Sequence, residues 1–365
     1  MSRIRTGVLL MVVPALAACS PASDEPVGDF LARTLPEGPG ATVIAARGDQ
    51  ISYCQGFGLA DRDARAAATC DTVYDVMSIT KQFTAAAILK LEMMGKLRTS
   101  DPISAYLGPV PAGKRKITLH HLLTHTAGLV EGLGDDYDVL SRDDMLARAL
   151  ASKPMSAPGV GFHYSNVGYS MLAAIVEKVS GLGYERFLAT YLFTPAGMTS
   201  TGYVLPRWKP GQVAVEYDAK GNSKGRPYEH RWATDGPYWN LRGNGGMLST
   251  ARDMFRWHRA LTGDAVLSAS AKDKLFTPYV RTPSSEESYA YGWSVRDTGD
   301  GRVAWHDGGN SWSLAAYVRS LHDGVMVFWV SNHAYRQGRW NLEDLASDLT
   351  LGIMNRTRSG SAATA

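Results

Sequence analysis

The chain has 365 residues, of which 45% are hydrophobic and 20% charged, and its formal net charge is +3. This length provides for one large domain or two closely joined ones, and the composition excludes a disordered or fibrous protein. The sequence contains no run of basic residues and no RNA-reading motif, so we expect no nucleic-acid partner.

Residues 1–18 predict a cleaved export signal. Arg3 and Arg5 give it a positive start, and an apolar stretch follows that is too short to span a bilayer as a helix. The sequence Leu-Ala-Ala-Cys that ends at Cys19 resembles the lipobox of bacterial lipoproteins, in which the cysteine is lipidated. An ordinary secretory leader with a chance cysteine is the alternative. Ser20 follows in place of an aspartate, which by the same resemblance favours the outer membrane.

A lipid on Cys19 would place the protein in the periplasm, joined to the membrane only through this anchor and a polar tether over residues 19–37. The periplasm is oxidising, so Cys54 and Cys70 form a candidate disulfide. A bridge that closes about 15 residues would contribute roughly 3 kcal/mol in the chain-entropy model. Two buried free thiols are the alternative.

The next stretch predicts a hairpin and then a helix. Ala41–Arg47 and Ile51–Leu59 are rich in β-forming residues and are separated by Gly-Asp-Gln. Residues 81–94 contain many apolar side chains and no glycine or proline, which predicts a helix. Ser78 stands three residues before Lys81 at the start of this helix, so the hydroxyl and the amine can touch.

In this Ser-x-x-Lys pair the lysine can activate the serine as a nucleophile. A serine hydroxyl is a weak nucleophile until a neighbour takes its proton, and a lysine can take it only when burial or nearby positive charge keeps the amine partly neutral. The amino end of a helix disfavours the ammonium form and also offers N–H donors to an oxyanion. The motif alone is weak evidence, so its meaning depends on partners further along the chain.

The middle of the chain is predicted to be mainly helical. Helical patterns occur at residues 117–123, 141–150, 168–180, 184–193, 249–261 and 268–276. Residues 205–239 interrupt this rhythm with six Trp and Tyr residues, which would form either a substrate wall or a small core. His121 and His125 have the spacing of a zinc pair, but no Glu lies between them as in a zincin. We therefore expect no metal and no cofactor.

Strand patterns return near the carboxyl end. They occur at residues 289–296, 302–305, 314–319 and 325–330. Residues 340–354 predict a final helix, and residues 355–365 predict a disordered tail. Strands at both ends of the chain predict an α+β fold. One antiparallel sheet would be built from both termini and flanked by helices, with a mainly helical middle subdomain over about residues 98–285.

Three motifs follow one another in the sequence: Ser78-x-x-Lys81, Tyr164-Ser165-Asn166 and His306-Asp307-Gly308-Gly309. Together with the stretches 118–129, 158–169 and 245–253, this set resembles the serine β-lactamase and penicillin-binding-protein superfamily. The resemblance covers roughly residues 38–354. It is to the branch with class C β-lactamases, D-alanyl-D-alanine carboxypeptidases, D-aminopeptidases and family VIII esterases.

The resemblance implies a role for each motif residue. Ser78 would be the acylated nucleophile, and Lys81 would be the amine that shares its proton. Tyr164 would act as general base, either as a phenolate or as a proton shuttle. An ordinary tyrosine has a pKa of about 10, so this role needs the positive charge of Lys81 nearby. Asn166 would hold Lys81 and contact the acyl side chain of the substrate.

The same resemblance implies the electrophilic side of the site. His306, Gly308 and Gly309 would lie on the edge strand of the sheet beside the nucleophile. The backbone N–H groups of Gly309 and Ser78 would form an oxyanion hole, in which each donor contributes about 2.7 to 4 kcal/mol in the transition state.

One departure from the superfamily bears on the substrate. Lactamases and carboxypeptidases generally have Lys-Thr-Gly on that strand, where lysine and threonine meet a substrate carboxylate, whereas this chain has His306 and Asp307. A histidine is charged only part of the time near pH 7, and an aspartate repels an anion. We therefore expect a serine hydrolase that cleaves an ester, an amide or a D-amino-acid peptide in preference to a β-lactam.

A non-catalytic envelope binding or scaffold member of the same fold is the alternative. Retention of Ser78, Lys81 and Tyr164 argues against it, because a pure binder has no chemical need for all three. As a hydrolase, the protein would take a small-molecule or peptide substrate, such as a peptidoglycan fragment, and we expect it to be a monomer.

Overall fold

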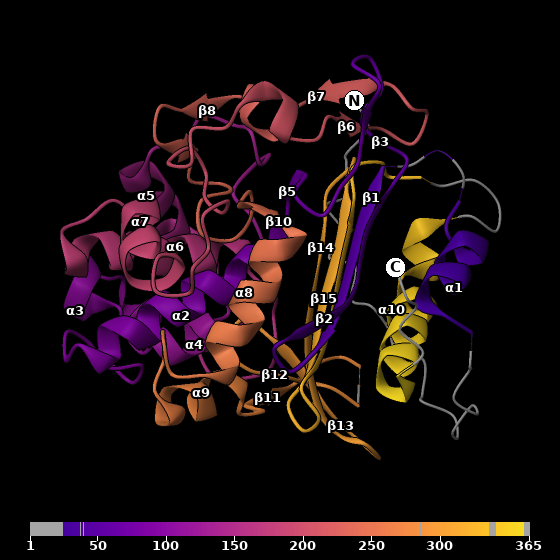
Figure 1. Ribbon diagram of the computed structural model, residues 1–365. Coiled ribbons are helices and arrows are strands. Elements are labelled where there is room, and N and C mark those ends of the chain that lie inside the picture. Colours follow the sequence, from indigo (N-terminus) through magenta and orange to yellow (C-terminus); the bar gives the residue numbers. More distant parts are fainter. Residues whose placement is uncertain (1–24, 37, 39, 285, 336–340, 361–365) are drawn as a thin grey trace.

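The computed structural model describes residues 25–36, 38, 40–284, 286–335 and 341–360. An eight-stranded sheet divides the molecule, with two helices on one face and the helical middle of the chain on the other (Figure 1). The export signal and Cys19 lie outside the described residues.

The sheet is built from both ends of the chain. Its strands are, in spatial order, β11 (Val280–Arg281), β12 (Ser288–Tyr289), β13 (Ser294–Thr298), β14 (Gly301–Gly309), β15 (Leu314–Ser320), β16 (Val325–Ser331), β1 (Ala41–Arg47) and β2 (Gln50–Phe57). Every neighbouring pair is antiparallel, and β1 lies between β2 and β16. The predicted α+β fold is therefore confirmed.

One predicted strand is divided in two. Residues 289–296 were expected to be continuous, but β12 ends at Tyr289 and β13 begins at Ser294. Between them the Ala290 N–H donates to the Trp293 carbonyl oxygen at 2.7 Å, and Gly292 has a φ of +75°. A tight turn that uses a glycine in the left-handed region thus makes a hairpin where the pattern predicted one strand.

Both faces of the central strands are buried. Every residue of β15 and β16 is buried. Tyr317 and Phe328 pack toward the helical subdomain, whereas Val318 and Trp329 pack toward the terminal helices. Such a three-layer arrangement explains why these strands are nearly continuous runs of apolar residues rather than alternating ones.

The helices α1 (Val27–Thr34) and α10 (Leu342–Ser359) cover one face of the sheet side by side (Figure 1). Here two predictions need correction. Part of the expected tether forms α1, because Val27, Phe30 and Leu31 have an apolar face to bury. The final helix continues five residues beyond its predicted end at Met354, because Arg356 packs its guanidinium over the Phe30 ring at 4.0 Å.

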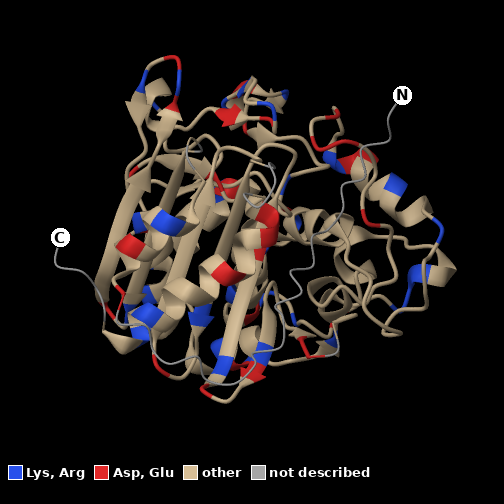
Figure 2. Cartoon of the chain, turned by 90° about the vertical axis from the view of Figure 1, so that its right-hand side faces the viewer, with Lys and Arg blue, Asp and Glu red and all other residues tan. Residues whose placement is uncertain are grey.

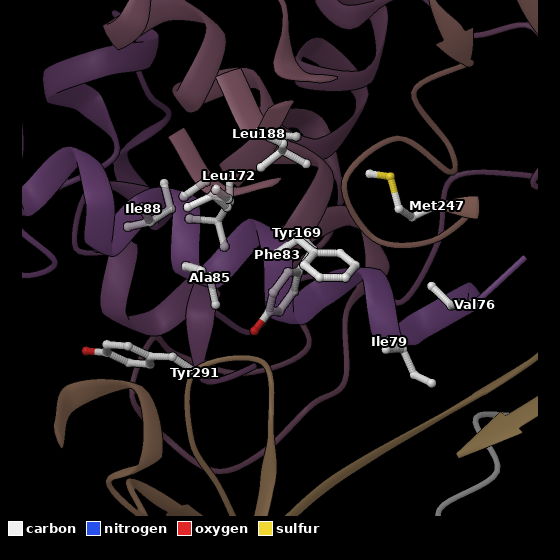
Figure 3. Close-up of a cluster of buried hydrophobic side chains, with 14 of the residues drawn as sticks. Val76, Ile79, Phe83, Ala85, Ile88, Tyr169, Leu172, Leu188, Met247 and Tyr291 are labelled. Atoms are coloured by element: carbon white, nitrogen blue, oxygen red, sulfur yellow. The ribbon is translucent and has the colours of Figure 1, made fainter. Parts of the chain in front are cut away.

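The helical subdomain lies on the other face of the sheet. Its helices are α2 (Thr80–Met93), α3 (Ser104–Leu107), α4 (Leu119–Leu123), α5 (Arg142–Ala151), α6 (Asn166–Ser180), α7 (Tyr184–Leu188), α8 (Ala251–Thr262) and α9 (Ala269–Phe276). A π-helical turn, Ala189–Phe193, extends α7, and short 3-10 turns occur at Met77–Ile79, Ala112–Lys114, Pro210–Gln212 and Pro227–Glu229. The helix α2 is buried along almost its whole length, and Figure 3 shows its residue Phe83 in one cluster with Leu172 of α6 and Leu188 of α7.

Short two-stranded ladders complete the fold. They pair β5 (Val73–Asp75) with β10 (Leu248–Thr250), β3 (Leu59–Asp61) with β4 (Ala66–Ala67), β6 (Glu216–Tyr217) with β7 (Ser223–Gly225), and β8 (Trp232–Ala233) with β9 (Gly236–Pro237). The aromatic segment 205–239 runs through the last two pairs. Trp208, Tyr228 and Trp232 pack against a small separate core there. Of the two roles predicted for this segment, a substrate wall or a small core, these three residues have the second.

The covalent and surface features are simple. Cys54 on β2 and Cys70 form a disulfide with a Cα–Cα distance of 6.1 Å. Across the part of the chain that the structure describes, no helix is both long and apolar enough to cross a bilayer. Figure 2 shows charges of both signs interspersed over the side that carries the terminal helices.

Candidate active site

Ser78 lies on a fixed backbone turn. The 3-10 turn Met77–Ile79 runs directly into α2, so the serine precedes the α-helix by one turn rather than beginning it. Met77 has a φ of +47°, a left-handed conformation that residues other than glycine rarely adopt. Asp75 Oδ1 accepts the Met77 N–H at 2.6 Å, which stabilises that conformation immediately before the serine.

The three residues of the predicted catalytic set meet at one atom. Lys81 Nζ lies 3.0 Å from Ser78 Oγ, and the Tyr164 hydroxyl lies 3.1 Å from the same oxygen. Lys81 also donates to the Asn244 carbonyl oxygen at 2.7 Å. Two segments that are far apart in the sequence thus place an amine, a phenol and a hydroxyl within hydrogen-bond distance.

The buried amine of Lys81 is neutral in about half of the molecules at pH 7. Its side chain has no solvent exposure, and burial lowers the pKa of Lys81 to about 7. The carboxylates of Asp136, Asp307 and Glu131 act in the opposite direction and limit the shift. A lysine with this pKa can accept a proton from a neighbouring serine at neutral pH.

The pKa of Tyr164 is shifted in the direction that keeps its side chain neutral and protonated. Burial raises the pKa of its phenol above the ordinary value, and the hydrogen bond to Ser78 opposes this shift. The phenol therefore keeps its proton near pH 7 and donates to Ser78 Oγ. A protonated phenol is compatible with the proton-shuttle role expected for Tyr164 and not with the phenolate role.

Asn166 does not hold Lys81 as the resemblance implied. Among the described residues, the partners of Lys81 Nζ are Ser78 and the backbone of Asn244. The Asn166 Oδ1 is buried and has no hydrogen-bond partner in the described part of the chain. The carbonyl oxygen of Asn244 therefore takes the place expected for Asn166. Nothing in the sequence indicated this contact, because any residue can supply a backbone oxygen.

The strand β14 brings the glycines of the third motif against the nucleophile. A Cβ added to Gly308 would lie 2.7 Å from the Val76 carbonyl oxygen and 3.1 Å from the Ser78 nitrogen. Only a glycine leaves room for the turn that carries Ser78. The expectation of an edge strand needs correction, because β14 lies between β13 and β15.

The end of β14 nevertheless has one free side. Its pairing with β13 stops at Trp305, so residues 306–309 pair with β15 alone. Asn310 N–H donates to the Ser313 carbonyl oxygen at 3.1 Å, and hydrogen-bonded residues alternate along an antiparallel ladder. The N–H of Gly309 therefore points away from β15, on the side where β13 has ended, as an oxyanion donor requires.

His306 and Asp307, which stand where the superfamily generally has lysine and threonine, provide no fixed positive charge. His306 Nδ1 donates to the Asp307 carbonyl oxygen at 2.6 Å, and its Nε2 accepts from the Tyr289 hydroxyl at 3.0 Å. Burial and the neighbouring Lys81 lower the pKa of His306 to about 3, so this ring is neutral at pH 7. Burial raises the pKa of Asp307 to about 7. Neither side chain would anchor a substrate carboxylate.

The other histidines singled out in the sequence have structural partners. His125 Nδ1 accepts the Ser165 N–H at 3.0 Å, and its ring lies 4.3 Å from the Tyr164 ring. His121 Nδ1 accepts the Thr118 N–H at 3.2 Å and completes the cap of α4. Within the described residues, no group of three or more His, Cys, Asp or Glu side chains could hold a metal ion.

The structure also reveals an aromatic stack that the sequence did not indicate. Trp312 lies 4.6 Å from His230 and 5.7 Å from Tyr137 between ring centroids, and His230 lies 4.3 Å from Tyr137. These rings come from three separate loops, and Trp312 follows Gly309 by three residues. His230 is thus the part of the aromatic segment 205–239 that extends toward the site. No spacing rule connects such distant loops.

Comparisons with known proteins agree with this fold and site. A family model described as Beta-lactamase matches residues 30–350. Penicillin-binding protein 4* of Bacillus subtilis (strain 168) is 29% identical over 307 residues, which cover 80% of this chain and 67% of that protein. Esterase EstB of Burkholderia gladioli is 35% identical over 198 residues, which cover 49% of this chain and 50% of the esterase.

A solved structure shows the same architecture. The octameric penicillin-binding protein homologue from Pyrococcus abyssi matches with a TM-score of 0.76 at 26% identity, over 89% of this chain and 77% of that one. The fold is that of the β-lactamases and penicillin-binding proteins, a hydrolase class. Because the family model matches most of the chain, the protein belongs to the beta-lactamase family. The resemblance seen in the three motifs is confirmed.

Proposed function

We propose that the protein is a serine hydrolase that forms an acyl-enzyme on Ser78. The observation that carries this proposal is the convergence of Lys81 Nζ and the Tyr164 hydroxyl on Ser78 Oγ, at 3.0 and 3.1 Å. Gly308 packs against the backbone of the serine, and the family includes an esterase and penicillin-binding proteins. A binding or scaffold protein would have no use for this arrangement.

In the proposed reaction, the neutral amine of Lys81 takes the proton of Ser78 as Oγ bonds to the carbonyl carbon of the substrate. The negative charge on the substrate oxygen is stabilised by the backbone N–H groups of Ser78 and Gly309. Tyr164 gives its proton to the leaving alcohol or amine and regains one from the Lys81 ammonium. A water molecule then attacks the acyl-enzyme while the same pair takes its proton and returns one to Ser78 Oγ, and the acid product leaves.

The charge around the nucleophile supports an ester, amide or D-amino-acid peptide without a carboxylate near β14. His306 is neutral at pH 7, and the carboxylates of Asp136, Asp307 and Glu131 are close enough to raise the pKa of Lys81. An anionic substrate group would meet repulsion from these carboxylates. We infer that β-lactams and free peptide carboxylates are poorer substrates than neutral esters.

The location of the enzyme also belongs to this proposal. We place it in the periplasm, anchored to the outer membrane by a lipid on Cys19, and acting as a monomer on a small molecule or a peptidoglycan-derived peptide. The bridge between Cys54 and Cys70 supports an oxidising compartment. Metabolic labelling with a palmitate analogue, compared between the wild type and Cys19→Ala, tests the anchor.

The hydrolase proposal is tested with a fluorescent fluorophosphonate and with p-nitrophenyl butyrate. The wild type should be labelled and should turn over the ester, and Ser78→Ala should lose both while keeping its melting temperature. Ser141→Ala, which changes the serine that caps α5, is the matched control and should behave as the wild type. A folded wild type without label or turnover would favour the scaffold alternative.

A substrate panel tests the charge argument separately. Nitrocefin, p-nitrophenyl butyrate and a D-alanyl-D-alanine peptide should be compared by kcat/KM, together with the amide of that peptide. We expect the ester and the amide to exceed nitrocefin and the free peptide acid. Efficient nitrocefin hydrolysis would contradict the preference inferred from His306 and Asp307.

A further inference from the structure

Two buried carboxylates lie next to each other beside the site. Asp75 ends β5 and is 5% exposed, and Glu216 begins β6 and is 1% exposed. Val213 forms a parallel bridge with Val73, and the Ala214 N–H donates to the Val73 carbonyl oxygen at 2.9 Å. The segment that carries Glu216 therefore runs alongside β5. Burial and then the charge of Glu216 raise the pKa of Asp75 well above its usual range.

Asp75 acts on the nucleophile side. Its Oδ1 accepts the Met77 N–H at 2.6 Å, and Met77 has the left-handed φ of +47°. A strained residue persists only where its surroundings fix it, at a typical cost of about 1–3 kcal/mol. Without this acceptor, the turn could relax and rotate the following peptide, which carries the N–H of Ser78.

Glu216 acts on the strand side. Its Oε1 accepts from Asn310 Nδ2 at 3.1 Å and from Ser313 Oγ at 2.7 Å. Asn310 Oδ1 in turn accepts the N–H groups of Trp312 and Ser313, both at 2.7 Å. These bonds close the turn that begins directly after Gly309, so they fix the direction of the last peptide of β14.

The opposite oxygen of Glu216 extends this network to the aromatic stack. Its Oε2 lies 3.4 Å from His230 Nε2, and the His230 ring stacks on Trp312 of the same turn. One buried carboxylate therefore contacts the turn through its polar groups and through a ring packed on it. Such a network holds its members in a single arrangement only when all of its polar groups have partners.

We propose, on the basis of the function proposed above, that Asp75 and Glu216 are positioning residues for the two halves of the oxyanion hole. Asp75 sets the N–H of Ser78 through Met77, and Glu216 sets the N–H of Gly309 through the turn at Asn310. Neither carboxylate touches the substrate. Their adjacency ties the turn before the nucleophile to the turn after β14, which are otherwise separate parts of the chain.

The test compares alanine with amide variants, because an amide keeps the acceptor oxygen that this role requires. Asp75→Ala and Glu216→Ala should each lower kcat for p-nitrophenyl butyrate by about tenfold or more with KM within about twofold, since donors to the oxyanion act in the transition state. Asp75→Asn and Glu216→Gln should keep kcat within about threefold of the wild type. Asp253→Asn is the matched control.

Asp253 is a buried carboxylate that accepts from the Ser200 N–H and the Thr201 hydroxyl, away from the proposed machinery. Its variant should lower the melting temperature and leave kcat unchanged. If Glu216→Ala and Asp75→Ala lose stability but keep the wild-type kcat, the two acids are merely structural and the proposal is overturned. Equal losses in the alanine and amide variants would also overturn it, because then the acceptor oxygen is not what matters.

A second measurement does not depend on activity. Amide hydrogen exchange in Glu216→Ala should be at least about fivefold faster in the peptide spanning residues 309–314 than in the wild type, and Asp253→Asn should leave that peptide unchanged. Exchange at the wild-type rate would overturn the positioning role. If the wild type itself hydrolyses no ester, the proposed function fails, and the exchange result still decides whether Glu216 fixes the turn.

Discussion

The two faces of the central sheet bury different chemistry. Under α1 and α10 the sheet presents aliphatic and indole groups such as Val327 and Trp329, which pack against Ile353 of the last helix. Toward the helical subdomain it buries Lys81 and His306, and burial lowers the pKa of both. Burying an ionisable group costs free energy, whereas burying an apolar group lowers the free energy of the fold.

This difference separates stability from reactivity within one domain. The face under the terminal helices contributes to folding without touching the site. The opposite face keeps an amine near neutrality and a phenol protonated, and both conditions follow from exclusion of water. Substitution of a site residue on one face and of a packing residue on the other should therefore have opposite signatures in activity and in stability.

The largest expected effect is on the reactive face. Lys81→Met should lower turnover of p-nitrophenyl butyrate by at least about 10³-fold, because it removes the group that takes the proton of Ser78. The melting temperature should change little, since an apolar side chain of similar length replaces a buried amine. Steady-state kinetics and thermal melts measure the two effects.

The control for this change is Lys90→Met on the same helix, where the amine donates to the Val266 carbonyl oxygen. It should keep the wild-type kcat. Undiminished turnover in Lys81→Met would show that Lys81 is not needed to take the proton of Ser78.

The next effect is on the other face. Phe30→Ala should lower the free energy of unfolding by about 3–5 kcal/mol, because it opens a cavity between α1 and α10. The ring lies against Gly352, where an added Cβ would be 2.2 Å from it. The kcat/KM of the folded protein should not change. Denaturant unfolding measures the loss, and Arg33→Ala, on the same helix with a side chain that is 63% exposed, should change it by less than about 0.5 kcal/mol.

A smaller effect is expected in the pH dependence of activity, which the reactive face should control through Lys81. Because Lys81 must be neutral and has a pKa of about 7, kcat/KM should rise about tenfold per pH unit below this value and level off above it. Asp307→Asn removes a charge that raises the pKa of Lys81, so the inflection should move to lower pH. An inflection that stays in place would remove Asp307 from the electrostatics of the amine.

The same pKa predicts a change in stability. An unfolded lysine has a pKa of about 10.4, so between pH 7 and that value the unfolded chain binds the proton that the folded protein lacks. The unfolding free energy of the wild type should therefore rise with pH across this window relative to Lys81→Met. Parallel urea unfolding at several pH values measures this difference, and identical pH dependence in the two proteins would contradict the depressed pKa.

The smallest effect is expected at the aromatic stack. Trp312→Ala removes the ring that packs on His230 at 4.6 Å. Such ring pairs contribute about 0.5–1.5 kcal/mol, so loosening the turn after Gly309 in this way should lower kcat for p-nitrophenyl butyrate only a few-fold, with little change in KM. Steady-state kinetics of the variant and the wild type measure both constants. A fall in kcat as large as that expected for Glu216→Ala would show that the stacked ring, and not only the polar bonds of Glu216, fixes this turn.

Local sequence was sufficient for most of the elements and for the choice of the proposed catalytic set. Apolar periodicity and turn residues predicted the β1–β2 hairpin, most of the helices and the carboxyl-terminal strands, because these signals depend on neighbours a few residues away. The three motifs identified Ser78, Lys81 and Tyr164 before any contact was known. One error was local, because the turn at Gly292 divides a predicted strand. Others occurred where a short stretch gains its structure from a distant partner, as α1 does from α10.

What the sequence determined by itself was the set of reactive groups and the order of the elements, since both are properties of adjacent residues. Tertiary structure alone decided that Asn244 rather than Asn166 holds Lys81, that β14 is an interior strand with a free end, and that Glu216 meets Asn310 and Ser313. It also decided which side chain of the site has a pKa near 7 and which keeps its proton. A pKa depends on how much water and charge surround a group, and only the folded chain determines those surroundings.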